Sequence, residues 1–293
     1  MKKRQDYTII TDITCDLSAE RLEAIGVTAM PLHVIIDGED YTHYADYRNI
    51  SLDDFLRRLK TCNEIKTSQL DAEIAEKTMR SILREGKDIL YISFSSSLSG
   101  TYTTAKIVAE DLLFEFPKAK IRVVDSLSAS GGLGMLVLLA VRQKEAGMGI
   151  DELANWLEEN RGHIGHWFTV DDLQHLKKGG RISGTTSFIG DILKVKPILH
   201  MNSEGKLVPH SKATGRKKSI EALVDKMRKH GNRSKLDTVF ISHSGPEEDV
   251  LLLKEKIEEN FEIREIIIEH IDPVIAAHVG FGGLALFFES KER

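Results

Sequence analysis

The sequence has few cysteines, few prolines and no long apolar run. Its 293 residues include only two cysteines and six prolines. Cys15 and Cys62 match no metal-binding spacing and no disulfide framework, so we expect two reduced thiols in a cytoplasmic protein. The longest apolar run, near residues 133–140, is too short to span a membrane, and we expect no integral membrane association. The basic start runs directly into a strand pattern, so no signal peptide is expected.

The chain as a whole also carries no excess of positive charge. The net charge is −5, which argues against a general nucleic-acid-binding protein. Residues 173–218 are the exception, because they hold ten Lys or Arg and two acidic residues, a local charge of +8. This basic segment predicts an acidic partner or a phosphorylated ligand. A solvated lysine surface is the alternative interpretation.

Strand and helix patterns alternate through the first half of the chain. Apolar runs precede helical periodicity three times, at residues 7–10, 89–92 and 121–124. This alternation predicts a mostly parallel, doubly wound sheet with helices on both faces. Later the pattern changes to a short strand, a hairpin around residues 202–205 and further strand–helix alternation. We therefore predict two α/β domains, residues 1–160 and residues 161–293.

The most distinctive segment is the serine loop, residues 93–102, which reads Ser-Phe-Ser-Ser-Ser-Leu-Ser-Gly-Thr-Tyr. It lies between a strand pattern and a helix pattern, where hydroxyls and free helix N–H groups can hold an anion. A second loop of this kind, residues 126–132, follows the next strand. Ligands of parallel sheets lie beyond the carboxyl ends of strands, so the two loops predict one shared site. Ordinary turns with helix caps are the alternative.

Signatures of catalysis and of nucleotide binding are missing. The sequence has no Gly-x-Ser-x-Gly elbow and no Walker A motif. Gly280-x-Gly282 fits a loose dinucleotide pattern, but no βαβ unit has room to follow it. His163 and His166 lack supporting ligands, so no metal site is predicted. His278 is the best candidate for a general base, although a packed, hydrogen-bonded histidine is the other interpretation.

In their order along the chain, these segments resemble the DegV family of bacterial fatty-acid-binding proteins. Residues 95–102 match the family's Ser-Ser-x-Leu-Ser-Gly-Thr-Tyr signature. Ile13 replaces a usual serine, and Leu70-Asp71 replaces a usual Pro-Ser. The resemblance covers nearly the whole chain, with further matches at residues 11–14, 66–69, 124–126, 171–182, 194–199 and 276–280.

The resemblance implies two α/β domains with a lipid between them. The family holds a long-chain fatty acid with its carboxylate among hydroxyls and its tail in a buried tunnel. When the family's carboxylate contacts are carried over to this sequence residue by residue, the resemblance implies Ser96 as the main contact of the carboxylate. The full set of predicted contacts is Thr67, Ser68, Ser95, Ser96, Ser99, Ser126, His278 and Gly280.

The resemblance also implies a partner, the catalytic subunit of an ATP-dependent fatty acid kinase, which docks through Arg181 and Arg216. The chain itself would then be no enzyme, with no cofactor beyond the bound fatty acid. Two alternatives stay open. One is a serine hydrolase or acyltransferase that uses a serine of the serine loop with His278. The other is a lipid sensor without a kinase partner.

Overall fold

The computed structural model describes residues 6–171, 173–182, 195–232 and 236–293. Its first layer is a four-stranded sheet in which every pairing is parallel. The strand order is β2 (Thr28–Met30), β1 (Tyr7–Asp12), β6 (Asp88–Ser93) and β7 (Ile121–Asp125). The central strands β1 and β6 are largely buried on both faces, as expected for a parallel sheet covered on both sides. This confirms the parallel sheet predicted from the sequence.

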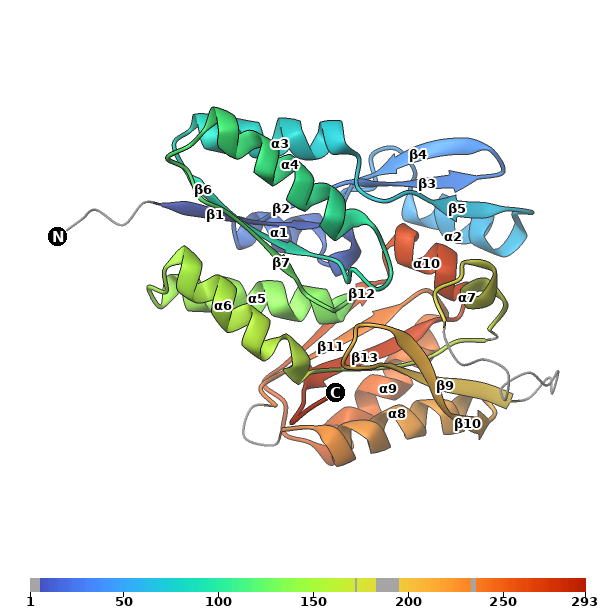
Figure 1. Ribbon diagram of the computed structural model, residues 1–293. Coiled ribbons are helices and arrows are strands. Elements are labelled where there is room, and N and C mark those ends of the chain that lie inside the picture. Colours follow the sequence, from blue (N-terminus) through green and yellow to red (C-terminus); the bar gives the residue numbers. More distant parts are fainter. Residues whose placement is uncertain (1–5, 172, 183–194, 233–235) are drawn as a thin grey trace.

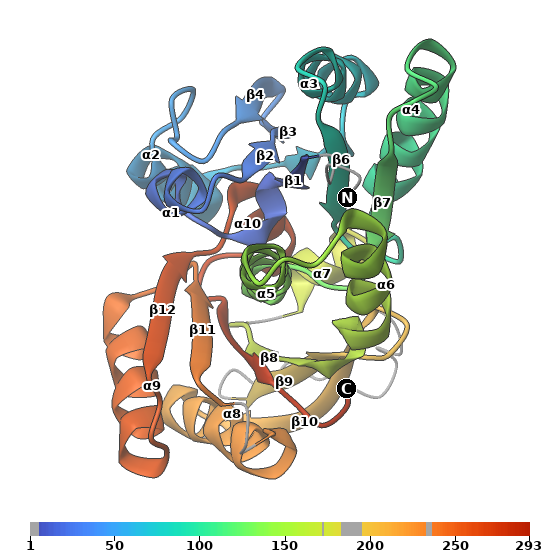
Figure 2. The ribbon, with the colours of Figure 1, turned by 90° about the vertical axis from the view of Figure 1, so that its left-hand side faces the viewer.

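Helices cover both faces of the parallel sheet (Figure 1). The helices α3 (Ala72–Arg84) and α4 (Thr101–Glu115) pack on one face, and α6 (Ile150–Asn160) packs on the other. The apolar run at residues 133–140 lies within α5 (Gly131–Glu145), which packs against strands of both large sheets (Figure 2). Burial on opposite sides explains why this helix is apolar all round. Within the described ranges, no helix combines the length and the apolarity that a membrane crossing requires.

The second large sheet is six-stranded and mixed. Its helix α8 (Arg216–His230) packs on β8, β9 and β10, and α9 (Glu247–Asn260) packs on α8. The hairpin predicted around residues 202–205 is confirmed, since β9 and β10 pair in antiparallel fashion. The strand order is β10 (Leu207–Thr214), β9 (Val195–Met201), β8 (Ile164–Thr169), β13 (Leu284–Glu289), β11 (Thr238–His243) and β12 (Glu265–His270).

A small antiparallel sheet consists of β4 (Glu39–His43), β3 (Leu32–Ile36) and β5 (Ile65–Thr67). Residues 30–36 are a mostly apolar run, which predicts a single strand, and this prediction is wrong. The chain divides at Pro31, so that β2 joins the parallel sheet and β3 joins the small one. Proline has no N–H for a strand ladder, which explains the break.

The helix α10 (Pro273–Val279), far along the chain, packs on β3, β5 and α2 (Leu52–Thr61). Elements from both halves of the sequence therefore meet at the small sheet, and the domain boundary predicted near residue 160 stays a prediction. The remaining helices are short: η1 (Ile13–Cys15), α1 (Ala19–Ala24), η2 (Arg161–His163) and α7 (Gln174–Lys178).

The buried carboxylate of Asp12 fixes the carboxyl ends of β1 and β6. It accepts hydrogen bonds from the Tyr91 hydroxyl at 3.0 Å and from the Phe94 backbone N–H at 2.9 Å. It also accepts from the hydroxyl and the backbone N–H of Thr14. Burial raises the pKa of this carboxyl. Because Phe94 is the second residue of the serine loop, the Asp12 network sets where that loop begins.

Asp12→Ala should lower the free energy of unfolding by about 3 kcal/mol, because several buried donors lose their acceptor. Tyr91→Phe removes one of those donors and should cost about 1 kcal/mol. Urea denaturation of both variants measures the two values. Equal losses would contradict the central position of the Asp12 carboxylate.

Candidate functional site

A polar cavity lies where the small sheet, the serine loop and α10 meet. Its polar lining comes from Thr67 at the end of β5 and from Ser68 and Gln69 just after it. Ser99 and Gly100 of the serine loop, Arg181 and His278 complete this lining. The Thr67 Oγ1 and His278 Nε2 atoms are 2.9 Å apart, a hydrogen bond between residues distant in the chain. The structure thus brings together four of the predicted site residues, Thr67, Ser68, Ser99 and His278.

Hydrogen bonds tie the loop after β5 to the start of α4. The Thr101 hydroxyl lies 2.9 Å from that of Ser99 and accepts from the Leu70 N–H at 3.1 Å. A β-carbon at Gly100 would overlap the Gln69 side chain, so glycine permits this close approach. The hydroxyls that line the polar cavity are therefore held in place by their neighbours.

The amino end of α4 also borders the polar cavity. Gly100 is the N-cap of this 15-residue helix and lines the cavity. The first N–H groups of a helix lack partners within it, and the helix dipole is positive there. The first turn of α4 carries no acidic side chain. This end of the cavity is therefore suited to a carboxylate.

The imidazole of His278 is neutral at physiological pH. Burial, followed by the nearby charge of Arg181 and by His175, lowers its pKa from the ordinary 6.5 to about 4. The ring can therefore take part in hydrogen bonds within the polar cavity without carrying a charge.

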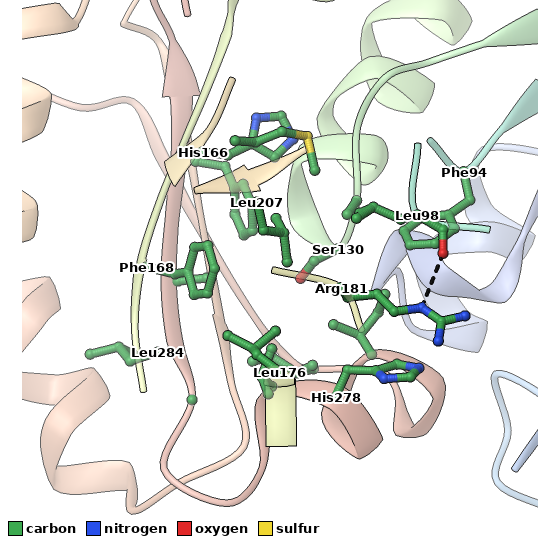
Figure 3. Close-up of a pocket in the computed structure, with 18 residues that line it drawn as sticks. Phe94, Leu98, Ser130, His166, Phe168, Leu176, Arg181, Leu207, His278 and Leu284 are labelled. Carbon is green, nitrogen blue, oxygen red and sulfur yellow. Dashed lines mark hydrogen bonds between the residues drawn. The ribbon is translucent and has the colours of Figure 1, made fainter. Parts of the chain in front are cut away.

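An apolar cavity adjoins the polar one. Its empty space, which includes space open to solvent, is about 610 Å³, and it reaches between the two large sheets. Figure 3 shows Phe168, Leu176 and Leu207 around it, with Arg181 and His278 on one side. The two cavities share five lining residues, Phe94, Leu98, Arg181, Ile275 and His278. A ligand with a polar head and an apolar tail can therefore occupy both.

Four predicted site residues, Ser95, Ser96, Ser126 and Gly280, line neither cavity. The Ser126 hydroxyl donates to the Ser128 carbonyl of its own loop at 3.3 Å. Gly280 ends α10 with a positive φ of 77°. Ser96 is exposed, and its backbone N–H donates to Asp125. Direct ligand contact by these four residues stays a prediction.

Ser95 instead connects the serine loop to the β9–β10 hairpin. Its buried hydroxyl donates to the Gly205 carbonyl at 3.0 Å, and the Ser97 hydroxyl donates to the Glu204 carbonyl at 2.6 Å. Gly205 has a φ of 74°, and a β-carbon there would crowd Ser95 and Leu127. Part of the serine loop therefore positions a hairpin that lines the apolar cavity through Met201 and Leu207.

The two hydroxyl-rich loops lie side by side, as the sequence predicts. The Ser95 N–H donates to the Ser128 carbonyl at 3.0 Å. The second loop contributes Ser130 to the apolar cavity, and the Ser130 hydroxyl donates to Asp16. The sequence singles out this loop as a whole but cannot show which of its serines faces inward.

The sequence predicts Arg181 only as a docking residue, but the structure places it at the junction of the two cavities. Its Nε donates to the Leu98 carbonyl at 3.2 Å and its Nη1 to the Gly179 carbonyl. Arg216 pairs with Asp249 at 2.8 Å, and its side chain is only 19% exposed. Residues 183–194 of the basic segment, which include Lys194, lie outside the described residues, as does Asp172.

Ser95→Ala should lower the free energy of unfolding by about 1 kcal/mol, because the Gly205 carbonyl loses a buried donor. It should also speed amide hydrogen exchange in the β9–β10 hairpin, which mass spectrometry can follow. Ser96→Ala is the matched control, since that side chain is exposed. An unchanged hairpin in Ser95→Ala would contradict the role of this contact.

The depressed pKa of His278 links stability to pH. The unfolded chain binds this proton near pH 6.5, whereas the folded protein binds it near pH 4. The stability gained from a neutral His278 is therefore present above pH 6.5 and lost as the pH falls through about 4. The free energy of unfolding of the wild-type protein, measured relative to that of His278→Gln, should fall by about 2 kcal/mol when the pH is lowered from about 7.5 to about 4.5. Denaturant titrations at both pH values measure it, and a constant difference would contradict the burial of a neutral ring.

Comparison with known proteins identifies a family that matches nearly the whole chain. The model of a family described as uncharacterised proteins of the DegV family matches residues 6–291. A DegV domain-containing protein of Clostridium perfringens is 38% identical over 100% of both chains. A DegV lipid-binding protein of Thermotoga maritima is 29% identical, with a TM-score of 0.87 over 98% of this chain and 99% of its own. A fatty-acid-binding DegV family protein of Thermus thermophilus is 30% identical, with a TM-score of 0.86 over 97% and 99%. The chain therefore belongs to the DegV family.

Proposed function

We propose that the chain binds one long-chain fatty acid, with the carboxylate in the polar cavity and the tail in the apolar cavity. The observation that carries this proposal is the direct junction of the two cavities through five shared lining residues. The similar proteins of Thermotoga maritima and Thermus thermophilus, described as lipid-binding and fatty-acid-binding, support it.

The tail supplies most of the affinity. Burial of a tail of about 16 carbons at about 0.8 kcal/mol per methylene contributes roughly 12 kcal/mol before the costs of binding. The head group then needs orientation more than a strong ion pair. Thr67, Ser99 and the amino end of α4 can donate to a carboxylate, and Arg181 adds a positive charge beside them.

The hydrogen bonds of His278 favour a binding protein over a serine hydrolase. A nucleophilic serine needs a base within hydrogen-bond reach. The Nε2 of His278 is 2.9 Å from Thr67, which lies outside the serine loop, and the lowered pKa makes the ring a weak base. We therefore assign no catalytic serine.

We further propose that the chain presents its fatty acid to a separate ATP-dependent kinase subunit. Hydroxyl donors orient a carboxylate without the bidentate grip of an arginine fork, so an oxygen stays available to a phosphoryl donor. The basic segment offers a docking surface through Lys177, Lys178, Lys217 and Lys218, which are exposed. Arg216, which begins α8 beside Lys217, is paired with Asp249.

Lipid extraction and native mass spectrometry of the protein test the first proposal. We expect one acyl chain per protein, or uptake of added palmitate or oleate. Thr67→Val should weaken palmitate binding about tenfold, because a buried carboxylate loses a donor. Thr28→Val, the same change on an exposed strand residue, is the control. A protein that holds no acyl chain and takes up neither acid would refute the proposal.

Co-expression and pull-down with a fatty acid kinase subunit test the second proposal. Charge reversal at Lys177, Lys178 and Arg216 should reduce kinase capture at least tenfold and leave palmitate affinity within about twofold. Arg181 is unsuitable for this purpose because it lines both cavities. Equal loss of capture and of lipid binding would contradict separate surfaces. A protein that binds lipid and captures no kinase would be a lipid sensor.

A further inference from the structure

One polar side chain that lines the apolar cavity has a buried atom without a hydrogen-bond partner among the described residues. The polar side chains in the lining of this cavity are those of Ser130, His166, Arg181 and His278. Ser130 donates to Asp16, Arg181 donates to the Leu98 carbonyl, and His278 bonds Thr67. The Nε2 atom of His166 is buried and has no partner among the described residues.

The protonation of His166 follows from its contacts. Its Nδ1 atom lies 2.9 Å from the Ile164 carbonyl oxygen, which can only accept, so Nδ1 carries the hydrogen. The residue is 3% exposed, and burial lowers the pKa of the ring well below its ordinary value. The ring is therefore neutral, and Nε2 is a buried hydrogen-bond acceptor.

Packing holds the imidazole ring of His166 in place. A β-carbon at Gly132 would lie 2.6 Å from both Cδ2 and Cε1 and closer still to Nε2. That position is over the face of the ring, whereas the lone pair lies in the ring plane. The Phe287 ring meets the imidazole edge to face at 5.2 Å. The acceptor is therefore fixed in direction.

His166 lies away from the head-group residues. It is absent from the lining of the polar cavity, which contains His278. Figure 3 shows His166 and His278 on opposite sides of the apolar cavity, with Leu207 and Ser130 between them. A polar atom of a ligand that reaches His166 therefore belongs to the part of the acyl chain distant from the carboxylate.

A plain hydrocarbon tail leaves this acceptor buried and unpaired, which is costly. A hydroxyl on the tail would donate to it and would itself be satisfied in an otherwise apolar wall. We propose that the cavity selects long-chain fatty acids that carry a hydroxyl group on the half of the chain remote from the carboxylate, through a hydrogen bond to His166 Nε2. This inference rests on the proposed fatty-acid binding and names its ligand class.

The wild-type protein tests the inference with palmitic acid and a series of hydroxypalmitic acids that differ in the position of the hydroxyl. One isomer, with its hydroxyl in the remote half of the chain, should bind about tenfold more tightly than the isomers with the hydroxyl at neighbouring carbons. Only in that isomer does the hydroxyl reach the Nε2 acceptor. The methoxy analogue of that isomer should lose the preference, since an ether cannot donate to Nε2. Competition measured by native mass spectrometry gives the ratios.

Two variants make a matched pair. His166→Asn keeps a donor near the place of Nδ1 and removes Nε2, so the preference for the hydroxylated isomer should disappear. His166→Gln can place its amide oxygen near the position of Nε2 and should restore part of it. Palmitate affinity is measured in each variant as the reference, so that the preference is the ratio of hydroxypalmitate affinity to palmitate affinity.

The outcomes separate this inference from the proposed function. Palmitate binding with equal affinities across the hydroxylated series overturns the inference and leaves fatty-acid binding in place. A preference that survives His166→Asn in a protein with a normal unfolding transition also overturns it. Failure of the wild-type protein to bind any acid of the series overturns both.

Discussion

The hydrogen bond between Thr67 and His278 joins the parts of the chain on which the binding site depends. Thr67 is the last residue of β5 in the small sheet. His278, which is 211 residues further along the chain, lies on α10, and this helix packs on the same sheet. The bond places hydroxyls beside the mouth of the apolar cavity. It gives the Nε2 atom of the partly buried His278 ring a partner, and the surroundings keep that ring neutral. The polar and apolar cavities adjoin because this junction is formed.

The serine loop has two structural roles. Ser99 and Gly100 face the polar cavity, whereas Ser95 and Ser97 hold the turn of the β9–β10 hairpin. Asp12 sets the start of the loop, and Asp125 accepts from the Ser96 N–H in its middle. A loop rich in hydroxyls thus lines the polar cavity and also holds the hairpin that forms part of the apolar cavity wall. This explains why so many serines lie in so short a segment.

The regular elements of the first half could be predicted, because helical and strand periodicities are local properties of the sequence. The break between β2 and β3 at Pro31 was not predicted from the sequence, since it depends on which sheet each strand joins. The residues of the site were predicted only in part. Thr67 and Ser99 stand in motifs, but the inward direction of Ser130, His166 and Arg181 depends on packing between segments far apart in the chain.

A structure of the protein crystallised with a long-chain fatty acid would locate both ends of the ligand. We expect a carboxylate within hydrogen-bond distance of the Thr67 hydroxyl, beside the amino end of α4, with the tail in the apolar cavity between Phe168 and Leu207. A carboxylate bound elsewhere on the protein, or a tail outside that cavity, would contradict this expectation.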